Sequence, residues 1–149
     1  MRIAPLSVLF LVLTLVLCSC GDTKEIETTK DVPLDKLIEQ YPDSALLFAK
    51  RGRINLEKQD FIHAYSDAST AFRLDSTDNV VEKLYADVLN NRPERSVADV
   101  YVAQRHFQNL LSKDGKNTEL LVAVASTFSQ QQDFEKAFSY INSALKIDP

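Results

Sequence analysis

Two stretches of this 149-residue chain repeat one pattern of residues at one spacing. Gln59-Asp60-Phe61-x-x-Ala64 is followed by Ala71-Phe72-x-Leu74-Asp75, and Gln132-Asp133-Phe134-x-x-Ala137 is followed by Ala144-Leu145-x-Ile147-Asp148. A unit that recurs in this way predicts an array of stacked helical units, because each unit must bury its apolar face against a neighbour. Such arrays serve as interaction surfaces far more often than as enzymes. The pattern therefore indicates a class of function without indicating the partner.

Both copies resemble tetratricopeptide repeats, which have units of about 34 residues with small residues at set places. The matching positions are Phe48, Arg51, Gly52, Asn55, Ala64, Ala68 and Ser76 in the first copy, and Leu121, Val124, Ala125, Phe128, Ala137, Ile141 and Pro149 in the last. The resemblance covers residues 33–149. It implies an all-α fold, a tetratricopeptide-type α-solenoid of stacked antiparallel helix pairs, with about three repeats after a leading half repeat.

Spacing divides the repeat region into units of approximately 45–78, 79–117 and 118–149. Leu34, Leu37, Ile38 and Tyr41 lie at helical spacing and form a short leading helix before the first unit. The middle unit is five residues longer than the others, and we expect the insertion near residues 90–96, where Pro93 forbids a continuous helix. The prediction is therefore seven helices, with Asp60 and Asp133 as helix caps.

Small residues are expected where paired helices approach closely. Gly52, Ala86 and Ala125 lie on the first helices, and Ala64, Ala103 and Ala137 lie opposite them on the second helices. Phe61 and Phe134 open the second helices and are expected to cover this contact, while Ala71 and Ala144 let the next unit dock. Arg51 and Asn55 replace apolar residues of the signature and Ala68 replaces an aromatic one, so we expect the first helix of the first unit to pack less tightly. In the middle unit, Glu82 stands where an apolar residue is expected.

The N-terminal segment has the features of an export signal. Arg2 precedes an apolar run over residues 6–17, which is shorter than the roughly 20 residues of a membrane-spanning helix. Leu17-Cys18-Ser19-Cys20 resembles a bacterial lipobox, which implies a signal peptide over residues 1–19 and fatty acyl chains on Cys20. Cys18 fits poorly because Leu17 is bulky. An uncleaved anchor helix over residues 3–20 is the alternative, and residues 20–32 indicate a flexible tether.

Composition and motifs argue against several classes of function. The net charge of −4 and the pI of about 5.2 argue against nucleic-acid binding. Cys18 and Cys20 are the only cysteines, and His63 and His106 lie in no cluster with metal-ligand spacing, so we expect both histidines on the outer face. No phosphate loop or nucleophile motif is present. We therefore expect no catalytic residue, no cofactor and no metal ion, and interpret the protein as a non-enzyme.

Stacked pairs curve, and their first helices are expected to line a groove for a peptide. Residues of the first helices that point away from the packing positions are the candidates: Ala49, Lys50, Arg53, Leu56, Lys83, Asp87, Asn90, Val122, Ser126 and Ser129. Lys50, Arg53 and Lys83 could hold a carboxylate of a bound peptide. The alternative is that these are ordinary solvated helix residues.

The hypothesis from sequence is a lipid-anchored scaffold of the bacterial cell envelope, most simply the outer membrane, that binds another protein or an extended peptide. Its alternative is the N-terminal repeat region of a longer enzyme or nutrient-binding lipoprotein. The chain stops at Asp148-Pro149 without a capping helix. We therefore expect either further sequence beyond this point or pairing with another subunit, including a homo-oligomer formed through the last repeat.

Overall fold

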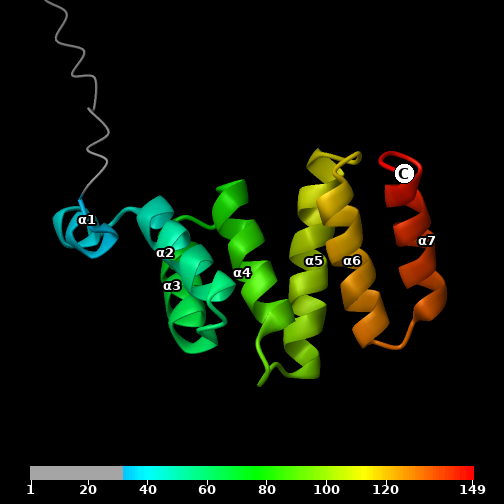
Figure 1. The fold of residues 1–149 in the computed structure, drawn as a ribbon, viewed down its shortest axis with the longest axis horizontal. Helices are drawn as coiled ribbons and strands as arrows, with labels where there is room; N and C mark the ends of the chain where they lie inside the picture. Colours follow the sequence, from blue (N-terminus) through cyan, green and yellow to red (C-terminus); the bar gives the residue numbers. More distant parts are fainter. Residues whose placement is uncertain (1–31) are drawn as a thin grey trace, which may run out of the picture. The chain divides into compact units, whose positions relative to one another are not determined.

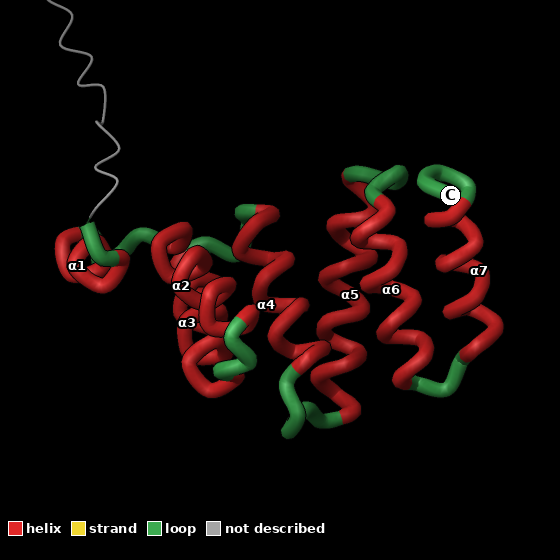
Figure 2. The backbone as a smooth tube through the Cα atoms, in the orientation of Figure 1, coloured by secondary structure: helices red, strands yellow, loops and turns green. Residues whose placement is uncertain are grey.

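The computed structural model describes residues 32–149, which belong to one compact unit. The predicted signal peptide, Cys20 and the tether up to residue 31 lie outside the described residues. Within residues 32–149 the chain forms seven α-helices and no strand (Figures 1 and 2), so the all-α expectation is confirmed. In chain order the helices are α1 Leu34–Gln40, α2 Ala45–Glu57, α3 Phe61–Leu74, α4 Asn79–Asn91, α5 Val97–Lys113, α6 Thr118–Gln130 and α7 Phe134–Leu145.

Short polar side chains determine where most helices begin. Asp60 accepts a hydrogen bond from the backbone N–H of His63, and Asp133 accepts one from that of Lys136. Each bond satisfies a donor that the first helical turn would otherwise leave without a partner. Ser96 begins α5 with a capping box, in which its side chain and that of Asp99 bond each other's backbone N–H groups.

The first and the last helix pairs turn through the same backbone conformation. Gln59 and Gln132 have φ angles of 60° and 63°, which is the left-handed region that side chains other than glycine adopt rarely. The Asp60 N–H then donates to the Asn55 carbonyl at 2.8 Å, and the Asp133 N–H donates to the Phe128 carbonyl at 2.9 Å. This is the Schellman arrangement, and it reverses the chain while satisfying the last helical carbonyl groups.

Two apolar clusters hold the stack together. One joins α2, α3 and α4 through Ala49, Ala64, Ala68, Ala71, Val81, Leu84 and Val88. The other joins α4, α5, α6 and α7 through Ala86, Leu89, Ala103, Phe107, Leu110, Leu120, Val124, Phe128 and Ala137. Because α4 contributes to both clusters, it is the element that links the first pair to the rest of the stack.

The middle pair is longer than the other two. The loop between α4 and α5 has five residues, against three between α2 and α3. In addition, Ala103 is the seventh residue of α5, whereas Ala64 is the fourth residue of α3. The extra length near residues 90–96 is therefore shared between the loop and the first turn of α5.

A polar cluster of Arg51, Asn55 and Asp67 packs between the helices of the first pair. Arg51 donates two hydrogen bonds to Asp67, at 3.0 and 2.7 Å, and Asn55 donates a third at 3.1 Å. Asp67 is buried on α3 beside Ala64 and Ala68. The expectation that Arg51 and Asn55 leave this pair poorly sealed is wrong, because both side chains converge on one buried carboxylate and satisfy it.

Candidate interaction surfaces

The small residues singled out from the sequence lie at the helix contacts. Gly52, Ala64, Ala71, Ala86, Ala103, Ala125, Ala137 and Ala144 are all buried. The approach is closest at Gly52, where an added Cβ would lie 3.0 Å from Leu84 Cδ2 and 3.1 Å from Asp67 Cβ. A larger side chain at this position would separate α2 from α4.

The two phenylalanines that open the second helices differ in environment. Phe61 is half-buried, but the Phe134 side chain is 56% exposed. Phe134 therefore covers the contact between its two helices less completely than expected. The Phe134 ring covers only part of the surface between α6 and α7, and no other helix in residues 32–149 covers the rest of it.

We call the surface formed by α2, α4 and α6 the first-helix face and define it by Lys50, Arg53, Lys83, Asp87, Asn90, Glu119 and Ser126. Lys50 is exposed, whereas Arg53, Leu56, Lys83 and Ser126 are half-buried. Asp87 and Asn90 are buried and Ala49 lies under α4, so the expectation that these three open into a groove is wrong. The neighbouring first helix covers them.

A chain of ion pairs crosses the first-helix face from α2 to α6. Arg53 Nη2 lies 2.7 Å from Asp87 Oδ2, which also lies 3.0 Å from Lys83 Nζ. Lys83 Nζ in turn lies 2.7 Å from Glu119 Oε1, and this hydrogen bond holds the pKa of Glu119 below its usual value. Two of the three cations predicted to bind a partner are therefore already matched by carboxylates of the protein.

Hydrogen bonds continue this face beyond the ion pairs. Asn90 Nδ2 donates to Ser126 Oγ at 3.3 Å, and Gln130 Nε2 donates to Asn90 Oδ1 at 2.8 Å. At the other end, a hollow of about 280 Å³ opens between α4, α5 and α6, and the charged residues Arg53, Lys83 and Glu119 are among its lining residues. Positively and negatively charged side chains thus line the surface from one unit to the next.

Sequence reasoning missed a second buried carboxylate. Glu82 on α4 accepts hydrogen bonds from Asn109 Nδ2 at 2.7 Å and Lys113 Nζ at 3.4 Å, and lies 3.1 Å from His106 Nδ1. Burial of Glu82 raises its pKa, but the hydrogen bonds from Asn109, His106 and Lys113 outweigh that effect and hold the pKa below its usual value. Glu82 therefore seals the α4–α5 contact in place of an apolar residue.

His63 and His106 occupy different environments. His63 is exposed and bonds the capping residue Asp60, as expected for an outer-face position. His106 is partly exposed on α5, but unlike His63 it makes contacts between units. Its ring lies edge-on to Phe72 and Tyr85, with ring centroids 5.2 and 5.8 Å away, and hydrogen-bonds Glu82.

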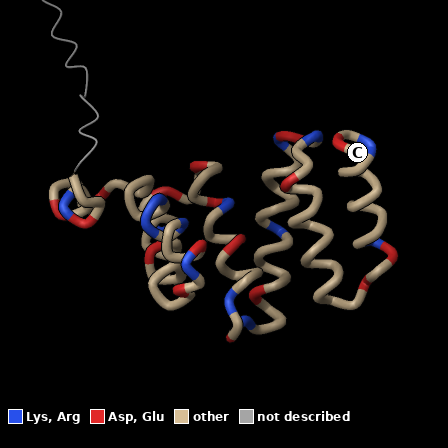
Figure 3. Tube along the Cα trace, in the orientation of Figure 1, with Lys and Arg blue, Asp and Glu red and all other residues tan. Residues whose placement is uncertain are grey.

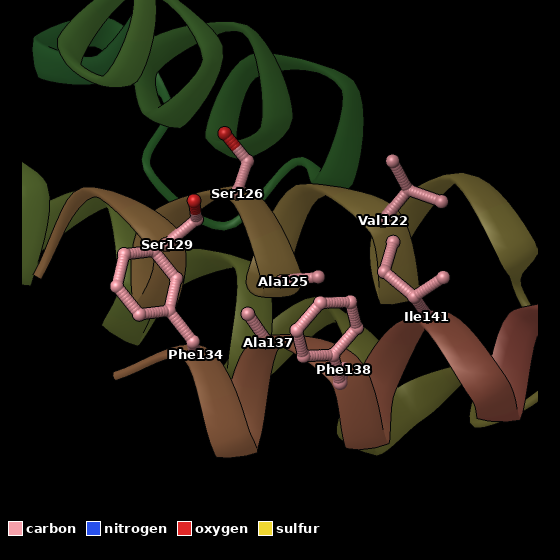
Figure 4. Close-up of a pocket in the computed structure, with 8 residues that line it drawn as sticks. All are labelled: Val122, Ala125, Ser126, Ser129, Phe134, Ala137, Phe138 and Ile141. Atoms are coloured by element: carbon pink, nitrogen blue, oxygen red, sulfur yellow. The ribbon is translucent and has the colours of Figure 1, made fainter. Parts of the chain in front are cut away.

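An apolar hollow of about 280 Å³ lies between the last two helices (Figure 4). Its lining, which defines the α6/α7 hollow, consists of Val122, Ala125, Ser126, Ser129, Phe134, Ala137, Phe138 and Ile141. Figure 4 shows the rings of Phe134 and Phe138 on either side of the Ala137 methyl group. Figure 3 shows that α6 and α7 carry charged residues mainly near their ends.

Two kinds of feature are absent from the described part of the chain. No group of three or more His, Cys, Asp or Glu residues within residues 32–149 is placed to hold a metal ion. None of the helices in that range combines the length and the apolar character that crossing a bilayer requires.

Comparison with known proteins identifies the fold. No protein-family model matches the sequence, and no curated protein matches it either. Among solved structures, the chain is similar to MamA MSR-1 C2, a tetratricopeptide-repeat protein, with a TM-score of 0.61 and 17% sequence identity. The match covers 77% of this chain and 63% of that one, so this chain spans less than two thirds of the length of MamA. The predicted fold class, an all-α tetratricopeptide-type α-solenoid, is confirmed.

Proposed function

We propose that this chain is an interaction scaffold of the bacterial cell envelope, anchored by fatty acyl chains on Cys20, that binds another protein or an extended peptide along its first-helix face. The observation that carries the proposal is the chain of ion pairs from Arg53 through Asp87 and Lys83 to Glu119, which crosses three successive repeats. A surface that presents paired charges over several units suits a long ligand better than a small molecule.

The partner is expected to carry both signs of charge. A carboxylate of the partner can take the place of Glu119 on Lys83, because Glu119 is largely exposed and gives up little by turning to water. Exposed Lys50 adds a further cation at the α2 end, and a basic side chain of the partner can pair with the released Glu119. Charge complementarity of this kind selects the partner and its register more than it adds affinity.

Cross-linking followed by affinity purification tests this surface. Lys50→Glu is the main variant, since Lys50 is exposed and the substitution leaves the packing intact; Arg53→Glu and Lys83→Glu extend it. Arg105→Glu on the exposed side of α5 is the matched control. We expect the cross-linked partners of the wild-type protein to be lost from Lys50→Glu and retained by Arg105→Glu. The same partners at the same yield in all variants would remove the first-helix face from consideration.

The anchor rests on the Leu17-Cys18-Ser19-Cys20 motif alone, and its test is independent of the first-helix face. Two or three acyl chains hold a protein almost permanently, because each buried methylene contributes about 0.8 kcal/mol. Metabolic labelling with an alkyne fatty acid should label the wild type and Cys18→Ser but not Cys20→Ser. Label that persists in Cys20→Ser contradicts the anchor, and separation of inner and outer membranes then tests the proposed outer-membrane location.

A further inference from the structure

The α6/α7 hollow repeats, residue for residue, a surface that is filled elsewhere in the chain. Gln132 follows Gln59 by 73 residues, and the same offset relates all eight lining residues of the hollow to residues of α2 and α3. The equivalents of Val122, Ala125, Ser126, Ser129, Phe134, Ala137, Phe138 and Ile141 are Ala49, Gly52, Arg53, Leu56, Phe61, Ala64, Tyr65 and Ala68.

In the first pair this surface is covered by α4. Leu84 lies against Gly52, and Val81 and Val88 belong to the same apolar cluster as Ala49 and Ala64. Helix α4 follows α3 through a short turn, so it runs parallel to α2 and begins beside the end of α3 (Figure 1). An amphipathic helix with aliphatic residues at i, i+3 and i+7 therefore fits this kind of surface.

In the last pair no other part of residues 32–149 covers the equivalent surface. Val122, Phe134 and Phe138 are 48%, 56% and 67% exposed. A second hollow, of about 390 Å³, continues from Val122 and Ile141 toward the C-terminal end of α7. Together the two hollows extend along the length of both helices, as the contact with α4 does in the first pair.

The charges around the two hollows constrain what can bind. Glu119 and Asp148 are among the lining residues of the second hollow, and no Lys or Arg among the residues described lines either one. By the geometry of α4, the N-terminus of an incoming helix enters at this acidic end, where its positive dipole and a basic residue in its first turn are favoured. In the α6/α7 hollow, Ser126 stands where the first pair has Arg53. A partner carboxylate at the position that corresponds to Asp87 would therefore lack the cation that pairs with Asp87 in the first pair.

We propose that the α6/α7 hollow binds one amphipathic α-helix of a partner protein, parallel to α6, with aliphatic residues at i, i+3 and i+7 and a basic first turn. Helix α4 of a second folded copy cannot be the occupant, because its Val81, Leu84 and Val88 are already buried in its own stack. The two hollows share Ser126 and Glu119 with the first-helix face, which carries the proposed function above, but Val122 and Phe138, the residues substituted below, lie outside that face.

A helix taken from the chain itself serves as the probe. A fluorescent peptide of residues 78–92, the α4 sequence with Glu82→Lys to supply the basic first turn, is titrated against the full chain in phosphatidylcholine nanodiscs and followed by fluorescence anisotropy. A second peptide carries Asp87→Ala, and a third has the same composition in scrambled order. We expect saturable binding of the first two, tighter for Asp87→Ala, and none for the scrambled peptide.

Two substitutions in the hollow test the site. Phe138→Glu and Val122→Glu replace exposed side chains, so the fold should persist, and each should weaken binding at least about tenfold. Tyr101→Glu, an exposed aromatic on α5 outside the hollow, is the matched control and should bind as the wild type does. Equal affinity in all four proteins, or no binding of either α4 peptide, overturns the proposal. So does sedimentation that shows a dimer of the chain dissolved by Phe138→Glu, since the occupant would then be a second copy.

Discussion

Arg51 on α2 donates two hydrogen bonds to the carboxylate of Asp67 on α3, from Nε at 3.0 Å and from Nη2 at 2.7 Å. Asp67 is only 4% exposed, so the pair forms the polar centre of the first helix pair. The remaining guanidinium nitrogen of Arg51 lies 2.7 Å from Asp35, which ties α1 to the same point. The Arg51 side chain therefore links α2 to both α1 and α3.

Removing Arg51 alone should be costly. Arg51→Met leaves Asp67 buried without its cation, and we expect the free energy of unfolding to fall by about 2–3 kcal/mol. Arg51→Met combined with Asp67→Leu should recover most of that loss, because the uncompensated charge is gone. Urea unfolding of the single and double variants measures both values, with the exposed Arg73→Met as control. If the double variant loses as much free energy of unfolding as Arg51→Met and Asp67→Leu lose together, this account is contradicted.

Glu82 should make the protein sensitive to acid. Its pKa is lower in the folded chain than in the unfolded chain, so the stabilisation is present above the unfolded-state pKa and is lost as pH falls through the folded-state pKa. Glu82→Gln should flatten the acidic part of the curve of unfolding free energy against pH. The exposed Glu94→Gln is the control, and an identical slope in both variants would show that other carboxylates account for the acid lability.

Gly52→Ala should destabilise the chain although it replaces a glycine inside a helix. The added methyl group would meet Leu84 and Asp67 at 3.0 and 3.1 Å, and we expect a net loss of about 1 kcal/mol after the gain in helix propensity. At Gly115 the nearest atom to an added Cβ is 3.8 Å away, so Gly115→Ala should cost little. Thermal melting of both variants followed by circular dichroism compares them. A rise in melting temperature for Gly52→Ala would show that α4 can move aside.

Gln59 and Gln132 are sites for stabilising substitutions. Both residues hold a left-handed conformation that glycine adopts without strain. Replacing either glutamine by glycine relieves about 1–2 kcal/mol of backbone strain. Glycine also has greater backbone entropy in the unfolded chain, which offsets part of this, so we expect the free energy of unfolding to rise by about 0.5–1 kcal/mol for Gln59→Gly or Gln132→Gly. Ser139 is an exposed residue in the middle of α7, and Ser139→Gly should instead lower the free energy of unfolding by a comparable amount. Chemical denaturation measures the free energy of unfolding of all three variants. A lower value for both glutamine variants would show that Gln59 and Gln132 are not strained.

Local features of the fold were predictable from the sequence. The helices begin at Asp60 and Asp133, as expected, because a cap acts within the first turn and depends on nothing distant. The burial of Gly52 and Ala64 follows from the repeat spacing, since the same small residues recur where two helices approach. The extra length of the middle pair was expected from spacing, but its division between the loop and α5 depends on packing around Ala103.

Side-chain partners between units were not predictable. The position of Asp87 on α4 predicts an open groove residue, but it gives no information about Arg53, which α2 supplies from the neighbouring unit. The sequence shows Glu82 only as a polar residue at an apolar position, because its partners Asn109 and Lys113 come from the far end of α5. An acidic residue at an apolar repeat position, with cations on the following helix, is the signal that could have indicated this buried cluster.

The Schellman turns at Gln59 and Gln132 have a consequence for how the protein acquires its structure. Each turn completes the reversal of the chain with hydrogen bonds between residues at most five positions apart. Helix hairpins α2–α3 and α6–α7 can therefore close without waiting for any other part of the chain, and contacts this local favour fast folding. The two hairpins can form independently of each other, and α4, which joins the two clusters, then couples them into one cooperative unit.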